Sequence, residues 1–259
     1  MIILMHSSKT MRPPTSGLRP SGTPALLERA EELVAYLRTL SLDQLAQVMK
    51  ISADLAEKVR DLHAAWSADP ADQAPAAATF VGDIYSGLQV DSFTAADRTY
   101  AGRHLRILSG LYGILRPFDG ISPYRLEMGY RLPPGGYANL YRFWGTSIAE
   151  QLPASGSIVN LAANEYSKTV LPHVDAGRVV TPRFLTADPA SGEPKFVVVH
   201  AKIARGAFAR WLVTERVGEG AIREFAEIGY RYDDVLSAPA EPAFVCKEFG
   251  GKGLSVRLT

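Results

Sequence analysis

The sequence predicts an α/β (α+β) protein in which helices wrap around a central mixed β core. Three patterns lead to this fold class: a short apolar strand at residues 1–5, apolar residues at helical spacing through residues 24–66, and further strand-like apolar segments such as residues 157–162. The chain has 259 residues and 47% hydrophobic content, enough for one substantial core. We therefore expect one compact domain over residues 1–259.

The segment at residues 24–66 is predicted to be helical throughout. Pro24 suits a helix start, Ser41 begins a capping-box pattern, and Ser52 is expected to cap a third helix. Small residues then dominate residues 67–79, which read as an internal linker. The expected sub-region is therefore three helices followed by a connection back to the main body.

Three helices joined by tight turns are also the start of a helix-hairpin-helix module, which binds the DNA backbone through main-chain N–H groups. The turn between the second and third helices is 50–52, and it contains no glycine. Basic and acidic residues alternate along the third helix. From the residues alone, an ordinary helical bundle explains this segment better.

The most distinctive stretch is residues 105–131. It is predicted to open as an apolar helix carrying Gly110 and Gly113, and to stop at Arg116, because proline follows. Beyond Pro117, large apolar residues alternate with polar and ionic ones. This alternation predicts a partly buried cleft that holds Asp119, Tyr124, Arg125 and Glu127.

Later segments alternate between strands and helices. Residues 179–185 and 195–200 are predicted as two strands joined by a hairpin, and the second leads into a helix that runs to about Arg216. Residues 229–232 and 243–246 are expected to form a closing β pair. The sequence contains no internal repeat.

Charge and composition exclude several classes of protein. The net charge is +1, so nucleic-acid binding would depend on a local patch. The single cysteine, Cys246, excludes an internal disulfide and a cysteine-based metal cage, and its apolar surroundings do not favour peroxide chemistry. No apolar run approaches the roughly 20 residues of a membrane helix, and the run at residues 2–5 does not form a signal peptide. We expect a cytoplasmic protein with no cofactor, no metal site, no membrane contact and no protein partner.

Polar side chains follow the predicted strands, where ligands collect in open α/β sheets. Lys9 and Thr10 follow the first strand, where hydroxyl and ammonium groups suit an anion. The strand at residues 157–162 leads to a second set: Asn160, Asn164, Glu165, Tyr166 and Lys168. Ordinary structure also explains both sets, as a polar strand exit with an exposed lysine and as a helix cap with a surface Glu–Lys pair.

Lys202 and Arg205 lie one turn apart at the expected start of the helix that follows residue 200. The helix dipole disfavours cations at this end. Either an anionic ligand or a carboxylate from the loops of Glu127 or Glu165 would compensate for that cost.

Five segments in register resemble the peroxide-stress protein YaaA family, and the similarity extends to Lys9-Thr10 at the first strand exit. The segments are FVGDIYSGL (80–88), LRILSGLYGILRPFDGISPYRLEMG (105–129), LYRFWG (140–145), IVNLAANEYSKTV (158–170) and AKIARGAFARWLV (201–213). The resemblance implies a single compact fold of helices around a β core, with an embedded helix-hairpin-helix. It also implies DNA binding that protects DNA during hydrogen-peroxide stress, associated with low free intracellular iron.

Two positions depart from the family pattern. Arg12 stands where the family often has an aspartate, and Asn164 replaces the aspartate of a common Asp-Glu-Tyr. Both changes make the expected cleft less negative. They favour an anionic ligand and leave open a relative with its own substrate.

Two functional hypotheses follow. The first is a DNA-binding stress protein, whose candidate contacts to double-stranded DNA are Lys9, Thr10, Arg116, Tyr124, Arg125, Asn160, Asn164, Tyr166, Lys168, Lys202, Arg205 and Arg210. The second is an enzyme acting on a small anionic substrate such as a nucleotide or nucleobase derivative. In that case Lys9, Arg116, Lys202 and Arg205 would hold the anion, Glu127 or Glu165 would act as general acid/base, and Tyr124 or Tyr166 would orient the substrate. A purely structural ionic network is the third interpretation.

Overall fold

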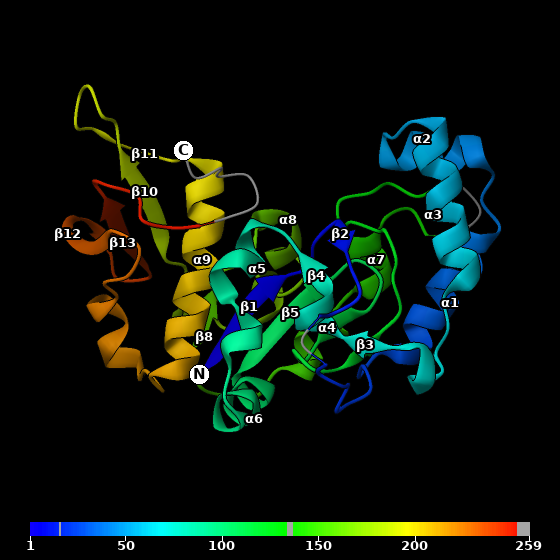
Figure 1. The fold of residues 1–259 in the computed structure, drawn as a ribbon, viewed down its shortest axis with the longest axis horizontal. Helices are drawn as coiled ribbons and strands as arrows, with labels where there is room; N and C mark the ends of the chain where they lie inside the picture. The colour runs from blue at the N-terminus through cyan, green and yellow to red at the C-terminus, as the bar shows by residue number, and fades with distance from the viewer. Residues whose placement is uncertain (16, 134–136, 253–259) are drawn as a thin grey trace.

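The computed structural model describes residues 1–15, 17–133 and 137–252 and shows mixed helices and sheets, as the sequence predicts. A five-stranded sheet occupies the centre, a helical bundle lies at one end, and a four-stranded sheet lies at the other (Figure 1). The buried apolar residues of all three regions form one core cluster. Within the described ranges, no helix is long and apolar enough to cross a membrane.

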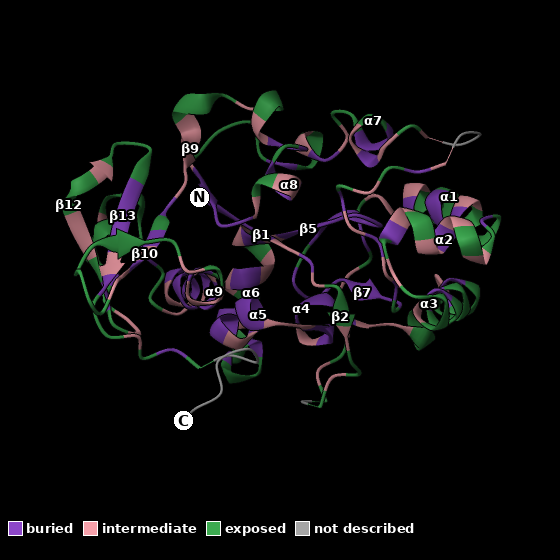
Figure 2. Cartoon of the chain, turned by 90° about the horizontal axis from the view of Figure 1, so that it is seen from above, coloured by how far each residue is buried: buried purple, intermediate pink, exposed green. Residues whose placement is uncertain are grey.

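The central sheet has the strand order β6-β5-β1-β8-β9. β1 (Ile2–His6) pairs in parallel with both β5 (Leu105–Ser109) and β8 (Ile158–Asn160), so the strand predicted at residues 1–5 is confirmed. β9 (Val179–Val180) and β6 (Gly113–Leu115) form the edges. Because both faces of the sheet are covered, β1 and β5 are almost fully buried and read as continuous apolar runs (Figure 2).

The helical bundle consists of α1 (Leu27–Arg38), α2 (Leu42–Met49) and α3 (Ala53–Ala65). Ser41 forms the predicted capping box with Gln44, and the hydroxyl of Ser52 accepts a hydrogen bond from the backbone N–H of Leu55. Each helix turns an apolar stripe inward and leaves its outer face exposed (Figure 2).

The remaining helices cover the central sheet. They are α4 (Ala76–Thr79), α5 (Asp83–Leu88), α6 (Ala95–His104), α7 (Leu140–Trp144), α8 (Asn164–Ser167) and α9 (Val198–Thr214). Short 3-10 turns occupy Pro70–Asp72, Val90–Ser92, Ala149–Gln151, Leu171–His173, Ala176–Arg178 and Glu219–Glu224. α5 and α9 cross at two glycines: a Cβ on Gly206 would lie 1.8 Å from the carbonyl oxygen of Ile84, and a Cβ on Gly87 would lie 2.1 Å from that of Ile203. Only glycine allows this backbone approach.

The second sheet has the order β11-β10-β13-β12 and packs against α9. Its strands are β10 (Arg183–Ala187), β11 (Pro194–Lys195), β12 (Tyr230–Ala238) and β13 (Glu241–Cys246). β12 and β13 are antiparallel, which confirms the predicted closing pair. Two short ribbons complete the fold: β2 (Thr10–Met11) with β4 (Phe80–Val81), and β3 (Ala74–Pro75) with β7 (Gly120–Ile121).

The prediction of a helix at the start of residues 105–131 is wrong. This segment forms β5 and β6, which turn through Gly113 at a φ of 68°. A short, fully buried apolar run has the same composition in a helix and in an inner strand, so periodicity alone does not separate them. Gly110 instead allows close approach to residue 126, whose carbonyl oxygen would lie 2.4 Å from a Cβ at position 110.

Other segments also differ from the prediction. Residues 179–185, expected to form one strand, divide between β9 in the central sheet and β10 in the second sheet. The strand expected at residues 195–200 ends at Lys195, and α9 begins at Val198 because packing against α5 overrides the β propensity of three consecutive valines. Residues 67–79 contain β3 and α4, whose Ala76 and Ala77 are buried. That stretch is part of the core and is no simple connection.

Candidate functional site

A pocket of about 460 Å³ lies beyond the carboxyl ends of β1 and β8. The exit of β1 supplies residues 6–10, α8 supplies Glu165 and Tyr166, and α9 supplies Lys202. Residues 81–84 and Glu127 complete the wall. The parallel strands therefore bring together side chains that are far apart in the sequence, as expected for an open α/β sheet.

Lys9 and Glu127 form an ion pair across the mouth of this pocket. The Nζ atom of Lys9 lies 2.7 Å from Oε2 of Glu127, and the Lys9 side chain is 52% exposed. Its hydrogen bond to Glu127 raises the pKa of Lys9. The pair holds a cation and a carboxylate at one opening, where an incoming anion can meet the lysine.

Glu165 is fixed by its backbone surroundings. Its Oε1 accepts a hydrogen bond from the backbone N–H of Gly129 at 2.7 Å, and its carbonyl oxygen accepts one from the hydroxyl of Tyr141 at 2.9 Å. A Cβ at Gly129 would lie 2.9 Å from the same Oε1, so a larger residue there would displace this end of the Glu165 side chain. One carboxylate oxygen of Glu165 is thereby held in place beside the pocket.

His6 is a neutral group in the pocket wall. Its ring stacks on Tyr166 with centroids 4.9 Å apart, and its Nδ1 accepts a hydrogen bond from the backbone N–H of Ala163 at 3.2 Å. A backbone N–H only donates, so the neutral ring carries its proton on Nε2. Burial, together with the smaller effect of the charges of Arg205 and Lys202, lowers the pKa of His6 to about 3.

Behind the pocket, Tyr124 and Asn160 belong to a buried layer. The hydroxyl of Tyr124 lies 2.6 Å from Oγ of Ser109, and burial raises its pKa to about 12. Asn160 accepts a hydrogen bond from the backbone N–H of Ala162 at 3.2 Å and donates one to Thr181 at 3.3 Å. These two predicted site residues shape the strand exits from behind.

A wider groove of about 850 Å³ adjoins the pocket and shares Lys9, Glu127 and Glu165 with it. One side comes from the end of α2 and the α2–α3 turn, and the other from residues 125–133. Four of its lining residues are cationic and two are acidic: Lys9, Lys50, Arg125 and Arg131 against Glu127 and Glu165. This balance makes the groove locally positive although the chain is nearly neutral.

Several predicted residues lie outside both hollows. Arg116 lies beside Asp119 on the other side of the central sheet, and Arg210 is bound to Glu227 and Gln89. Asn164 and Lys168 are exposed at the two ends of α8 without lining either hollow. Because α9 begins at Val198, Lys202 lies in its second turn and Arg205 in its third, so the expected dipole cost does not arise.

The sequence interpretation also missed residues. His6 lines the pocket, and Lys50 and Arg131 line the groove. His6 is the last residue of β1 and lies three residues before Lys9, so its place at the strand exit was the available signal. The groove depends on how the helical bundle docks, and no local pattern encodes that.

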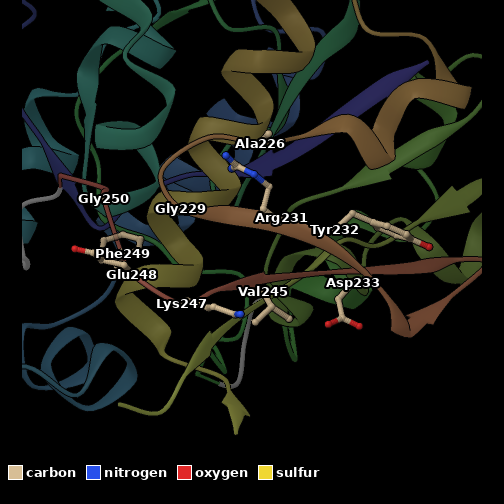
Figure 3. A pocket seen from close by; sticks show the side chains of 10 residues that line it. All are labelled: Ala226, Gly229, Arg231, Tyr232, Asp233, Val245, Lys247, Glu248, Phe249 and Gly250. Carbon is tan, nitrogen blue, oxygen red and sulfur yellow. The ribbon is translucent and has the colours of Figure 1, made fainter. Parts of the chain in front are cut away.

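Another hollow, of about 780 Å³, lies on the C-terminal sheet (Figure 3). Its side chains come from β12, β13 and residues 247–250, and they mix Arg231, Asp233, Lys247 and Glu248. Balanced charges leave no preference for an ion of either sign. No group of three or more His, Cys, Asp or Glu residues in the described part of the chain is placed to hold a metal ion.

The pocket at the strand exits is built from segments that also define a protein family. Residues 1–236 match the family model described as Peroxide stress protein YaaA. The chain belongs to this family. All the residues that line the pocket and the groove fall within the matched range.

Relatives in the family are similar over nearly their whole length. A UPF0246 protein from Salinispora tropica is 60% identical over 258 residues, which cover 99% of this chain and 98% of the relative. A UPF0246 protein from Ruegeria sp. strain TM1040 is 40% identical and covers 95% of this chain and 99% of its own. One from Burkholderia vietnamiensis is 42% identical, with coverage of 92% and 95%.

Proposed function

We propose that this chain binds double-stranded DNA by its phosphate backbone and thereby protects DNA during hydrogen-peroxide stress, in association with low free intracellular iron. Membership of the peroxide stress protein YaaA family supports the stress role. The observation that supports DNA binding is the cationic groove between the α2–α3 turn and residues 125–133.

The charges of the groove suit a polyanion. Its two carboxylates are already engaged, Glu127 by Lys9 at 2.7 Å and Glu165 by the backbone N–H of Gly129 at 2.7 Å. Lys50 and Arg131 are exposed, and within the described residues neither forms an ion pair with a carboxylate. Such cations are free to replace the counterions of phosphates.

The α2–α3 turn supports a helix-hairpin-helix role without glycine. Lys50 adopts the left-handed conformation, with φ of 52°, that glycine usually supplies at the end of a helix. α3 then begins at Ala53, and the first N–H groups of a helix have no acceptor within it. Backbone N–H groups of this kind hold phosphate oxygens without reading bases.

The test is a salt titration of the purified chain with a labelled duplex, followed by fluorescence anisotropy. One phosphate contact from each of the four groove cations predicts a slope of log K against log salt of about −3.6. Replacing Lys50 and Arg131 by alanine should reduce the slope by about 2, close to one for each contact. Arg183→Ala, an exposed arginine on β10 at the other end of the molecule, is the matched control. A slope near zero, or equal losses in the control, would refute this function.

A second candidate function is catalysis on a small anionic substrate in the 460 Å³ pocket. The observation that favours it is that Lys9, Lys202 and two glutamates line one pocket. Glu127 or Glu165 would serve as general acid/base, while the lysines hold the anion. His6 is unsuited to that proton transfer, because its pKa lies far below neutral.

Glu165→Gln separates the two functions. Glutamine keeps an oxygen for the N–H of Gly129 but has no carboxylate to accept a proton. DNA affinity should stay the same or rise slightly, whereas turnover of a nucleotide found in a thermal-shift screen should be abolished. Unchanged turnover would exclude Glu165 as the base.

A further inference from the structure

A second cationic hollow lies on the side of the central sheet opposite to Lys9. Figure 1 shows α6 below the sheet and β2 above it. Two adjoining cavities, of about 240 and 60 Å³, share Arg116 and Asp119 in their walls. We call this the arginine hollow; its charged residues are Arg98, Arg103, Arg106, Arg116 and Asp119.

The charges of the arginine hollow are unbalanced. Four guanidinium groups face one carboxylate, so its lining carries a net charge of +3. The whole chain carries only +1, which makes this a strong local concentration. The described ion pairs involve none of these four arginines.

Two of the arginines are held and two are available. Arg98 donates to the carbonyl oxygen of Phe93 at 2.5 Å, and Arg106 donates to that of Gly102 at 3.1 Å. Arg103 and Arg116 are exposed, and the described hydrogen bonds include none from their guanidinium groups. Their donors therefore face the hollow or the solvent.

The single carboxylate does not neutralise the hollow. Asp119 is 2% exposed, and its Oδ2 accepts the backbone N–H of Arg116 at 2.7 Å. Its Oδ1 is buried without a hydrogen-bond partner and lies against Gly22, where a Cβ would come within 2.5 Å of it. The carboxylate is thus turned into the wall, and the arginines define the open side.

The helix that supplies this wall leaves room for a ligand. Arg98, Thr99, Gly102 and Arg103 form one stripe along α6, at the spacing that brings residues to one helical face. A Cβ at Gly102 would meet no atom within 4 Å, so there is open space between the arginines. The hydroxyl group of Ser21 adds a donor at the rim, whereas that of Thr99 already donates to the carbonyl oxygen of Ala95 at 3.0 Å.

We propose that the arginine hollow binds a phosphate group, free or as the monoester end of a small molecule. Guanidinium groups form paired hydrogen bonds with phosphate oxygens, and a dianion best matches a net charge of +3. Ligand pockets for drug-sized molecules span roughly 300–1,000 Å³. The main cavity, at about 240 Å³, suits one phosphate with the rest of an ester extending into solvent.

The site is independent of the DNA groove, because the two have no lining residue in common. The test uses isothermal titration calorimetry of the full chain with inorganic phosphate, at an ionic strength held constant with sodium chloride. Adenosine 5′-monophosphate in a second titration distinguishes a free phosphate from an ester. Stronger binding of either probe identifies the source, and saturable binding is the expected result.

The decisive variants are Arg103→Gln and Arg116→Gln, separately and together. Each should weaken binding by about tenfold, as expected for lost hydrogen bonds to a charged group. Both residues are exposed, so folding should be retained, which circular dichroism checks. Arg183→Gln and the Lys50→Ala, Arg131→Ala protein should bind phosphate like the wild type. Wild-type affinity in the Arg103, Arg116 double variant, or loss of phosphate binding in the groove variant, would overturn the proposal.

Discussion

The crossing of α5 and α9 gives the sharpest prediction about stability. Gly206→Ala would place a methyl group 1.8 Å from the carbonyl oxygen of Ile84 and 2.7 Å from the backbone nitrogen of Leu88. Both neighbours are backbone atoms of α5, so no side chain can rotate away. Ordinary contact begins at 3.4 Å, and the two helices must therefore separate by about 1.6 Å.

The expected cost follows from two opposing terms. Overpacking a rigid contact costs about 3 kcal/mol, and alanine regains up to about 1 kcal/mol of helix propensity. A net loss of about 2 kcal/mol remains, because the steric term is larger. With a urea m-value of about 2–3 kcal/mol/M, the midpoint of unfolding should fall by close to 1 M.

Gly102→Ala is the matched control for this measurement. It also lies inside a helix, α6, but a Cβ there meets no atom within 4 Å. Its midpoint should rise slightly, because only the propensity term acts. If Gly206→Ala unfolds at the wild-type midpoint while Gly102→Ala behaves as expected, the close crossing of α5 and α9 is refuted.

Three further predictions concern buried groups. Burial lowers the pKa of His63 to about 4 in the folded chain, whereas in the unfolded chain the imidazole takes up a proton below about pH 6.5. The free energy of unfolding of the wild type should therefore fall by about 2 kcal/mol between pH 7 and pH 5 because of His63. Urea unfolding at both pH values should show that His63→Met removes this loss. The hydroxyl of Tyr112 accepts from Nε1 of Trp66 at 2.8 Å and from the N–H of Ser122 at 3.0 Å, so Tyr112→Phe should cost about 3 kcal/mol in thermal unfolding; an unchanged melting temperature would contradict this. Burial raises the pKa of Cys246, so hydrogen peroxide and thiol reagents should modify it only after unfolding, and rapid modification of the native chain would show the opposite.

Local chemistry made much of the fold predictable. The capping box at Ser41 and the cap at Ser52 set helix starts by side-chain hydrogen bonds to neighbouring residues, and both are present. Residues 105–115 were mistaken for a helix, because strand or helix is decided there by pairing with β1, about 100 residues away. The strand predicted at the first turn of α9 was wrong for the same reason, because contact with α5 outweighs the local β propensity.

The candidate site was also only partly predictable from the sequence. Strand exits brought Lys9, Glu165 and Tyr166 together as expected, because the ends of parallel strands share an edge of the sheet. Arg116 was grouped with them from its charge, although it follows β6, which runs antiparallel to β5 and ends at the opposite edge. The charge of a residue determines which ligands it can bind, but the direction of the preceding strand determines at which end of the sheet it lies.

The two ends of the sheet therefore hold cations in different ways. At the pocket, Lys9 is already paired with Glu127, so an anion must share or displace a carboxylate, which leaves a base beside the bound ligand. In the arginine hollow, Arg103 and Arg116 form no described ion pair, and the one carboxylate, Asp119, accepts the backbone N–H of Arg116 while its Oδ1 is buried. The first arrangement combines binding with a group able to move a proton, and the second only binds. The pocket at Lys9 therefore suits an anion that undergoes a reaction with proton transfer, whereas the arginine hollow suits an anion that is only bound.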